Sequence, residues 1–394
     1  MENRPRFASR TSWNLELNPL AQALEARRKS GREILDLTES NPTRCGFQYD
    51  GDSPLRALTD PRAMFYEPHP RGLLPAREAV ARYYAEQRAA VRPEHIVLTS
   101  GSSEAYSFLF RLLAEPGDNV LVPRPGYPLL EFLSRLNDVE LSSYRLMYHG
   151  NWEIDFDSLE AAADERTRAV IVVNPNNPTG SIVRPSERLM IEDFCRRRGL
   201  ALISDEVFLD YTFPEAAGAA GTFAGTSGCL AFALNGLSKT AALPQMKLGW
   251  IAAAGPAGLA EEALDRLEVI ADTYLSVATP AQWALPELLA ARRRIQRQIL
   301  DRITGNLHCL DQLLSRQSLC ARSNIEAGWS AILRAPGTLS DEERALELLD
   351  KDGVLVHPGH FFDFGGEGYL VVSLLPPPLV FREGISRMLA RITA

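Results

Sequence analysis

The stretch Leu230-Ala-Phe-Ala-Leu-Asn-Gly-Leu-Ser-Lys-Thr240 carries the pattern around which the rest of the chain is organised. Its first five residues form a continuous apolar run, which is typical of a buried strand, and Asn235-Gly236 is a turn signal at the end of that run. Lys239 therefore follows a strand end, and further apolar residues come after it. Burial lowers the pKa of a lysine and makes its amine a better nucleophile. Taken alone, the stretch is also compatible with an ordinary surface lysine.

The composition is that of a globular enzyme with more than one domain. The chain has 394 residues, too many for one ordinary core, and 45% of them are apolar and 23% charged. A net charge of -8, from 42 basic and 50 acidic residues, argues against nucleic acid as a partner, and no basic stripe is present. No apolar stretch of about 18 residues occurs, so no membrane span is expected.

Cysteine usage predicts a reducing, cytoplasmic location. The cysteines are scattered, number five and contain no CxxC pair, which favours free thiols over disulfides. The first six residues lead into no apolar segment, so no secretory signal is expected. The sequence indicates no metal site.

Continuous apolar runs alternate with helical patterns along most of the chain, which predicts an α/β fold with a mostly parallel sheet covered on both faces. We expect seven strands in a large domain over residues 45–280. Residues 1–44 and 281–394 are expected to form a smaller α/β domain that includes an N-terminal arm. The seven strand candidates are His95–Thr99, Asn119–Val122, Glu140–Tyr144, Ala169–Val173, Ala201–Ser204, Leu230–Leu234 and Gly249–Ala253.

Polar residues gather where these strands end, and sheets of this kind bind ligands at that edge. Ser100-Gly-Ser-Ser-Glu104 opens a helix, where exposed N–H groups and hydroxyls suit a phosphate, although an ordinary N-cap looks the same. Tyr127, in Pro123-Arg-Pro-Gly-Tyr-Pro128, could stack on a planar ligand or simply pack in its loop. Asn174-Pro-Asn-Asn-Pro-Thr-Gly180 is richer in Asn, Pro and Gly than a connection requires, and we expect Asn177 to project over the strand ends.

Asp205 ends the strand Ala201–Ser204, and a carboxylate there is costly without a cationic partner. A protonated pyridine nitrogen would supply that partner, whereas an N-capping aspartate is the alternative. A phosphate cup, a stacking ring, an amide, a carboxylate and a lysine are together what a pyridoxal phosphate site requires.

The chain resembles the class I/II aminotransferases, the aspartate-aminotransferase-like fold-type I pyridoxal phosphate enzymes, over essentially its whole length. The motifs that carry the resemblance are Gly101-Ser-Ser-Glu-Ala105, Pro125-Gly-Tyr-Pro128, Asn174-Pro-Asn-Asn-Pro-Thr-Gly180, Asp205-Glu-Val207 and Ser238-Lys-Thr-Ala-Ala-Leu-Pro244.

The resemblance implies a role for each site residue. Lys239 is implied as the Schiff-base lysine and acid/base, and Asp205 as the partner of the pyridine nitrogen. Asn177 would bind the 3′ oxygen and Tyr127 would stack on the ring. The remaining cofactor contacts it implies are Gly101, Ser102, Ser103, Ser238, Lys247 and, from a second subunit of a homodimer with shared active sites, Tyr66.

Four positions depart from the family pattern. Phe208 replaces the usual Tyr, which removes one hydrogen bond to the 3′ oxygen and is expected to raise the pKa of the imine. Lys247 replaces a phosphate-binding Arg and keeps the charge without the bidentate fork. Gly236 stands where a phosphate-binding Ser is frequent. Val371, in Tyr369-Leu-Val-Val-Ser373, replaces the Arg that holds the substrate α-carboxylate, a contact worth a few kcal/mol.

The resemblance predicts transfer of an amino group from an amino acid to a 2-oxo acid. A pyridoxal phosphate-dependent lyase, decarboxylase or cyclase, and a non-enzymatic regulator that uses the same fold, remain as alternatives. Arg10, Arg44 and Arg71 are candidates to replace the missing arginine, or else surface or interface residues. Trp329, His360 and the pair Phe361-Phe362 are expected to approach the pocket and hint at an apolar or aromatic substrate side chain.

Overall fold

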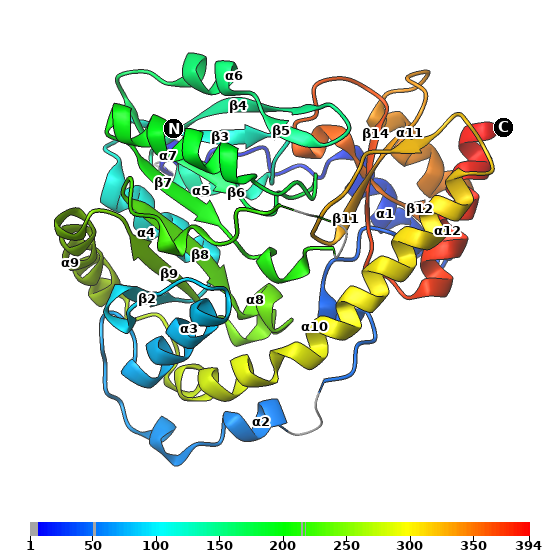
Figure 1. Ribbon diagram of the computed structural model, residues 1–394. Coiled ribbons are helices and arrows are strands. Elements are labelled where there is room, and N and C mark those ends of the chain that lie inside the picture. The colour runs from blue at the N-terminus through cyan, green and yellow to red at the C-terminus, as the bar shows by residue number, and fades with distance from the viewer. Residues whose placement is uncertain (1–6, 50–52, 214–215, 217) are drawn as a thin grey trace, which may run out of the picture.

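The computed structural model describes residues 7–49, 53–213, 216 and 218–394. It contains a large sheet, a smaller sheet and one long helix that runs from the first to the second (Figure 1). Residues 1–6, which begin the expected N-terminal arm, lie outside the described residues.

The large sheet has eight strands in the order β2-β9-β8-β7-β6-β3-β4-β5. Neighbours from β8 through β7, β6 and β3 to β4 are parallel, and the pairs at both edges are antiparallel. All seven expected strands are present, and the sequence missed only β5, a three-residue strand that pairs with the end of β4. The strands are β2 (Ile96–Thr99), β3 (Asn119–Arg124), β4 (Glu140–Tyr148), β5 (Trp152–Ile154), β6 (Thr167–Val173), β7 (Ala201–Asp205), β8 (Ala231–Gly236) and β9 (Gly249–Ala254).

Helices bury both faces of this sheet, which is why its strands are apolar throughout. Val120 and Val122 of β3 pack with α4, α5 and α9 in one cluster, whereas Leu121 between them packs with α6 and α7 in another. This alternation follows from the two-residue period of a strand. A third cluster joins α3 and α10 to β2, β8 and β9. The helices of this part are α2 (Ser53–Ala57), α3 (Leu74–Glu86), α4 (Ser102–Leu113), α5 (Leu129–Leu136), α6 (Phe156–Ala162), α7 (Pro185–Arg198), α8 (Leu237–Thr240) and α9 (Ala257–Tyr274).

The smaller sheet has the order β10-β11-β14-β13 and is antiparallel. Nearby, β1 pairs in parallel with β12, so the N-terminal segment joins the C-terminal part of the chain. The elements here are α1 (Pro19–Lys29), β1 (Leu35–Asp36), β10 (Ala321–Arg322), β11 (Ser330–Arg334), α11 (Asp341–Glu347), β12 (Val354–Leu355), β13 (His357–Pro358), β14 (Tyr369–Ser373) and α12 (Pro378–Thr393).

Helix α10 (Thr279–Leu314) links the two sheets. Its first half packs on α3 and its second half packs on α12 (Figure 1). The sequence predicts one helical stretch interrupted near Thr279-Pro280, and the structure has α9 end at Tyr274 and α10 begin at Thr279. Proline is tolerated in the first turn of a helix, so Pro280 marks this start.

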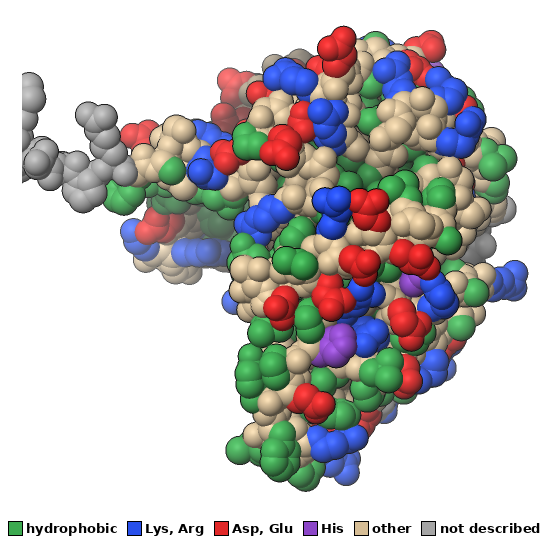
Figure 2. Space-filling model, turned by 90° about the vertical axis from the view of Figure 1, so that its left-hand side faces the viewer, with side chains coloured by type: hydrophobic (Ala, Val, Ile, Leu, Met, Phe, Trp, Pro, Cys, Tyr) green, Lys and Arg blue, Asp and Glu red, His purple; other side chains and the backbone are tan. Residues whose placement is uncertain are grey.

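The surface carries charges of both signs. Figure 2 shows acidic and basic side chains interspersed over one face of the molecule. Among the described residues, no helix has the length and hydropathy needed to cross a membrane.

Asn306 fixes the second half of α10 to the segment after β14. Its buried amide donates to the carbonyl oxygens of Leu374 at 2.8 Å and Pro376 at 2.9 Å. We expect Asn306→Ala to lower the free energy of unfolding by about 1–3 kcal/mol, because two buried acceptors lose their donor. Denaturant unfolding measures the change. The exposed Arg297→Ala on the same helix is the control and should alter stability by less than about 0.5 kcal/mol.

Candidate active site

A cavity of about 360 Å³ lies at the edge of the large sheet where its parallel strands end, and the smaller sheet closes it from the other side. Most of the residues that the sequence singled out line this cavity. They are Ser102, Ser103, Tyr127, Asn177, Asp205, Ser238 and Lys239 from the large-sheet side, and Trp329, Phe362 and Val371 from the smaller-sheet side.

Lys239 is enclosed by protein and open to the cavity. Strand β8 runs two residues further than expected, to Gly236, and α8 then places the lysine past the strand end. The ammonium nitrogen lies 5.0 Å from the ring centre of Trp329 and 5.7 Å from that of Phe208. Burial lowers the pKa of Lys239, and the carboxylate of Asp205 opposes that shift. An amine with a lowered pKa is available as a nucleophile and as a base.

The side chain of Asn235 fixes the backbone conformation between the end of β8 and α8. Its amide nitrogen donates to Tyr83 Oη at 3.1 Å and to the carbonyl of Glu206 at 2.9 Å. Its amide oxygen accepts from the backbone N–H of Gly236 and the hydroxyl of Thr240. Because every polar atom of this buried amide is bonded, the position of α8, and of Lys239 on it, is fixed from within the core.

Asp205 ends β7, the strand next to β8. Its Oδ2 accepts from Tyr106 Oη at 3.0 Å, and its Oδ1 accepts from the backbone N–H of Val207 at 3.2 Å. Burial raises the pKa of Asp205, and these two hydrogen bonds together with the charge of Lys239 oppose the rise. No ion pair joins Asp205 to a described cation, so the carboxylate remains available to a cationic ligand in the cavity.

The turn before α4 forms a narrow backbone cradle. Gly101 has φ 148°, and a Cβ on Gly249 of β9 would lie only 3.0 Å from the Cα of Gly101. A Cβ on Gly101 would in turn lie 4.0 Å from the ammonium nitrogen of Lys247, which places that cation beside the N-terminus of α4. Exposed N–H groups, the hydroxyls of Ser102 and Ser103 and a nearby ammonium make an anion site.

The three asparagines after β6 have different surroundings. Asn174 binds backbone groups of Gly221 and Val183, and Asn176 accepts from Thr179, so both hold the loop together. Asn177 lines the cavity instead. Tyr127, which is 48% exposed, also lines the cavity.

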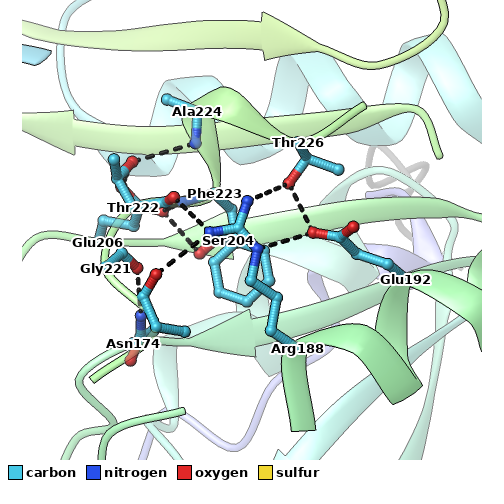
Figure 3. Close-up of polar contacts among 11 residues, drawn as sticks. Asn174, Arg188, Glu192, Ser204, Glu206, Gly221, Thr222, Phe223, Ala224 and Thr226 are labelled. Carbon is cyan, nitrogen blue, oxygen red and sulfur yellow. Dashed lines mark hydrogen bonds and ion pairs between the residues drawn. The ribbon is translucent and has the colours of Figure 1, made fainter. Parts of the chain in front are cut away.

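Glu206, directly after Asp205, anchors the end of β7 (Figure 3). Its carboxyl oxygens accept from Thr222 Oγ1 at 2.6 Å, the backbone N–H of Phe223 at 2.7 Å and Ser204 Oγ at 3.0 Å. Arg188 of α7 lies over the ring of Phe223 and pairs with Glu192, which extends the network to the helix. The carboxyl group next to Asp205 is therefore fixed both to its own strand, through Ser204, and to the segment at Thr222 and Phe223.

Several expected residues lie elsewhere. None of the three candidate arginines lines the cavity: Arg10 pairs with Asp138, Arg44 with Glu39, and Arg71 with both Asp265 and Glu268. Their cations already meet carboxylates outside the cavity, so the prediction that they reach the pocket is wrong for this single chain. Tyr66 is 76% exposed and lines a separate small hollow.

His360 was the histidine expected at the pocket, but it is exposed and does not line the cavity, whereas His357 does. His357 belongs to β13, and His360 lies in the short 3-10 helix Gly359–Phe362 that follows it. Thr38, Ser40, Tyr106, Ser330 and Ser373 also line the cavity and were missed. Ser373 ends the quoted stretch Tyr369–Ser373 and Tyr106 directly follows Gly101–Ala105, but neither pattern assigned these two residues a role. Thr38, Ser40 and Ser330 lie outside the quoted motifs, so only the folded chain brings them to the cavity.

Comparison with known proteins finds one family over most of the chain. The model described as aminotransferase class I and II matches residues 54–377. S-alkyl-thiohydroximate lyase SUR1 of Arabidopsis thaliana is 36% identical over 222 residues, which are 55% of this chain and 48% of that protein. Nicotianamine aminotransferase A of Hordeum vulgare is 28% identical over 334 residues, 80% of this chain and 70% of that protein. The chain spans about half the length of several curated relatives that it matches.

The architecture recurs in solved structures. The alanine aminotransferase from Pyrococcus furiosus superimposes with a TM-score of 0.89 at 23% identity, covering 98% of this chain and 100% of that one. A Thermus thermophilus aspartate aminotransferase mutant gives a TM-score of 0.85 at 22% identity, covering 99% and 100%. At these identities the likeness concerns the fold.

The buried carboxyl of Glu206 gives stability a pH dependence. Burial raises its pKa from 4.5 to about 7, so the folded protein holds a proton there that the unfolded chain loses near pH 4.5. The stabilisation is complete below pH 4.5 and is lost as pH rises through about 7. We expect the free energy of unfolding of the wild type, minus that of Glu206→Gln, to fall by about 3 kcal/mol between pH 4.5 and 8. Denaturant titrations across this range measure the difference, and a difference independent of pH would contradict the assignment.

Proposed function

Because the chain belongs to the class I and II aminotransferases, we propose that it moves an amino group from an amino acid to a 2-oxo acid in the cavity around Lys239. The family membership and the fold-type I architecture that the sequence predicted are confirmed. Pyridoxal 5′-phosphate is the cofactor of this family. The observation that carries the proposal is an enclosed amine and an enclosed carboxylate at neighbouring strand ends of one cavity.

The residues present fit this cofactor. Asp205 is an enclosed carboxylate without an ion-pair partner among the described side chains, which suits a protonated ring nitrogen. The turn at Gly101 lies so close to Gly249 that a Cβ on Gly249 would come within 3.0 Å of Gly101 Cα, and the N–H groups at the start of α4 suit a phosphate. In the proposal, the phosphate is held by Ser102, Ser103, Ser238 and Lys247, the ring is stacked by Tyr127 and the 3′ oxygen is bound by Asn177.

Lys239 and Asp205 have distinct tasks in the proposed reaction. When bound, pyridoxal 5′-phosphate supplies an electron sink that stabilises negative charge at the substrate α-carbon. Lys239 Nζ would hold the cofactor aldehyde at rest, and the same amine, once free, would take the proton from the substrate α-carbon. Its lowered pKa suits it to that second task, since a base must be unprotonated near neutral pH. Asp205 keeps the ring nitrogen protonated.

The proposal includes a homodimer with shared sites. Tyr66 lies outside the cavity of its own chain, and the neighbouring Met64 and Phe65 are 86% and 73% exposed. Exposed apolar side chains next to one another are typical of a surface that contacts another protein. In a second copy, Tyr66 would reach the phosphate site of the first.

The proposal also places the large domain at residues 45–280 and the small domain at 1–44 and 281–394, and the protein in the cytoplasm. Helix α10 begins at Thr279, and its second half packs with elements of the C-terminal part of the chain. All five cysteines are free thiols, four of them buried, which is compatible with a reducing compartment.

One relative is named as a lyase, so a lyase reaction is the second candidate function. A panel of amino donors with pyruvate and 2-oxoglutarate separates the two reactions. Amino-group transfer requires the 2-oxo acid, whereas a lyase releases a fragment of the substrate without an acceptor.

We expect Lys239→Ala to abolish both covalent attachment of the cofactor and activity. Borohydride reduction of the wild type in the presence of pyridoxal phosphate should label the peptide that carries residue 239, and no other lysine among the four in the chain. Lys239→Ala should remain unlabelled and lose about a thousandfold or more in turnover. Lys351→Ala removes an exposed lysine and serves as the control. A label elsewhere in the wild type would refute the assignment.

We expect Asp205→Asn to reduce turnover by about a hundredfold or more at saturating cofactor, because a neutral amide cannot keep the ring nitrogen protonated. Asp210→Asn is the matched control. Asp210 is also a buried acid, but it binds Tyr83 and Gln87 and does not line the cavity. Turnover of the two variants, each with its thermal unfolding midpoint, separates loss of chemistry from loss of stability. Equal losses in both variants would count against a special role for Asp205.

A further inference from the structure

The cavity lacks the cation that would normally hold a substrate carboxylate. Val371 points its side chain into the cavity wall and packs with Trp152, Ile332, Phe362 and Phe364 in an apolar cluster. No arginine is among the described residues that line the cavity. Lys239 is the one lysine there, and the proposed function commits it to the cofactor.

His357 lies directly across from Val371. Strand β13 pairs antiparallel with β14, and in their register His357 is opposite Val371. Side chains of directly opposed residues in an antiparallel pair project to the same face, with their Cβ atoms about 5 Å apart. Both residues line the cavity, so the imidazole reaches the space beside the valine.

Two serines extend the polar part of this wall. Ser373 is two residues beyond Val371 on β14 and is paired with Ser330 of β11, so both share the face of the sheet that carries Val371. Both line the cavity. Ser373 Oγ accepts from the backbone N–H of Leu375, which leaves its own hydroxyl hydrogen free to donate. The wall thus presents an imidazole and two hydroxyls around an apolar centre.

The surroundings of His357 leave its ring available to a ligand. The rings of Phe361 and Phe362 lie 6.0 and 5.8 Å from the imidazole, and no hydrogen bond from a described residue reaches its ring nitrogens. Burial lowers the pKa of His357, and the charge of Asp36 opposes that shift. Asp36 Oδ1 already accepts from the backbone N–H and the hydroxyl of Thr38. An imidazole N–H is a donor in either protonation state. A carboxylate beside the ring raises the pKa of the imidazole, and the bond becomes charge-assisted when the ring takes up a proton from solvent.

We infer that His357 binds the carboxylate of the substrate, in place of the arginine that Val371 replaces, with the hydroxyls of Ser330 and Ser373 as adjoining donors. This inference rests on the proposed function, since it concerns the substrate of that same cavity. One imidazole offers a single donor where a guanidinium offers a fork, so the carboxylate is held less rigidly and the apolar wall contributes more to selectivity.

The test compares two ligands that differ in the carboxylate alone. Calorimetry on the protein loaded with pyridoxal phosphate gives the affinities for 3-phenylpropanoate and for 3-phenylpropan-1-ol, which has the same ring and chain without the charge. We expect the wild type to prefer the carboxylate. His357→Asn should weaken 3-phenylpropanoate about tenfold while changing the alcohol less than twofold.

His360→Asn is the matched control, because this exposed histidine lies three residues away and outside the cavity. It should leave both affinities unchanged. His357→Arg supplies a permanent cation at the same place and should restore or tighten binding of the carboxylate, which a purely structural role of His357 would not predict.

A wild type that binds both ligands equally would overturn the inference, as would a His357→Asn variant that weakens them equally or a His360→Asn variant that behaves like it. The labelling of residue 239 and the requirement for a 2-oxo acid are measured separately on the wild type. If those succeed while carboxylate binding is independent of residue 357, the proposed function stands and this inference alone is lost.

Discussion

The enclosure of one ammonium and one carboxylate at neighbouring strand ends is the constraint on which the rest of the site depends. A charge removed from water is costly unless something in the protein or a ligand compensates for it. Here each charge offsets part of the shift that burial imposes on the pKa of the other. The remaining compensation of Asp205 comes from Tyr106 and the backbone of Val207. The buried side chains of Asn235 and Glu206, one on each of the two strands, hold the backbone in the conformation that places these charges.

Most of the large sheet could be predicted from the sequence, and so could most of the residues that it contributes to the cavity. The strands are buried on both faces, so each is a continuous apolar run with a visible end, and the polar residues at those ends belong to one edge by topology. The same reasoning predicted that Lys239, Asp205 and Asn177 lie together at this edge, and all three line the cavity. The sequence did not predict β5, because this strand is three residues long and contains no continuous apolar run.

The smaller sheet contributes the part that sequence reasoning could not place. Its strands are two to five residues long, and register decides which of two nearby histidines faces the cavity. The pairing of β13 with β14 selects His357, whereas the sequence analysis expected His360. The candidate arginines failed for a related reason. The carboxylate partners of Arg10 and Arg71 are distant in sequence and become neighbours only in the folded chain, whereas Arg44 pairs with the nearby Glu39.

Helix α10 connects the large sheet and the smaller sheet, which form the two walls of the cavity. Its 36 residues correspond to about 54 Å of helix at the usual rise per residue. A tilt of about 5° at its first turns, where it packs on α3, would displace its last turn by about 5 Å. Asn306 couples the far part of the helix to the segment just after β14, the strand that carries Val371. A small angular change where α10 packs on α3 would therefore shift the segment that follows β14, and with it the part of the cavity wall that carries Val371.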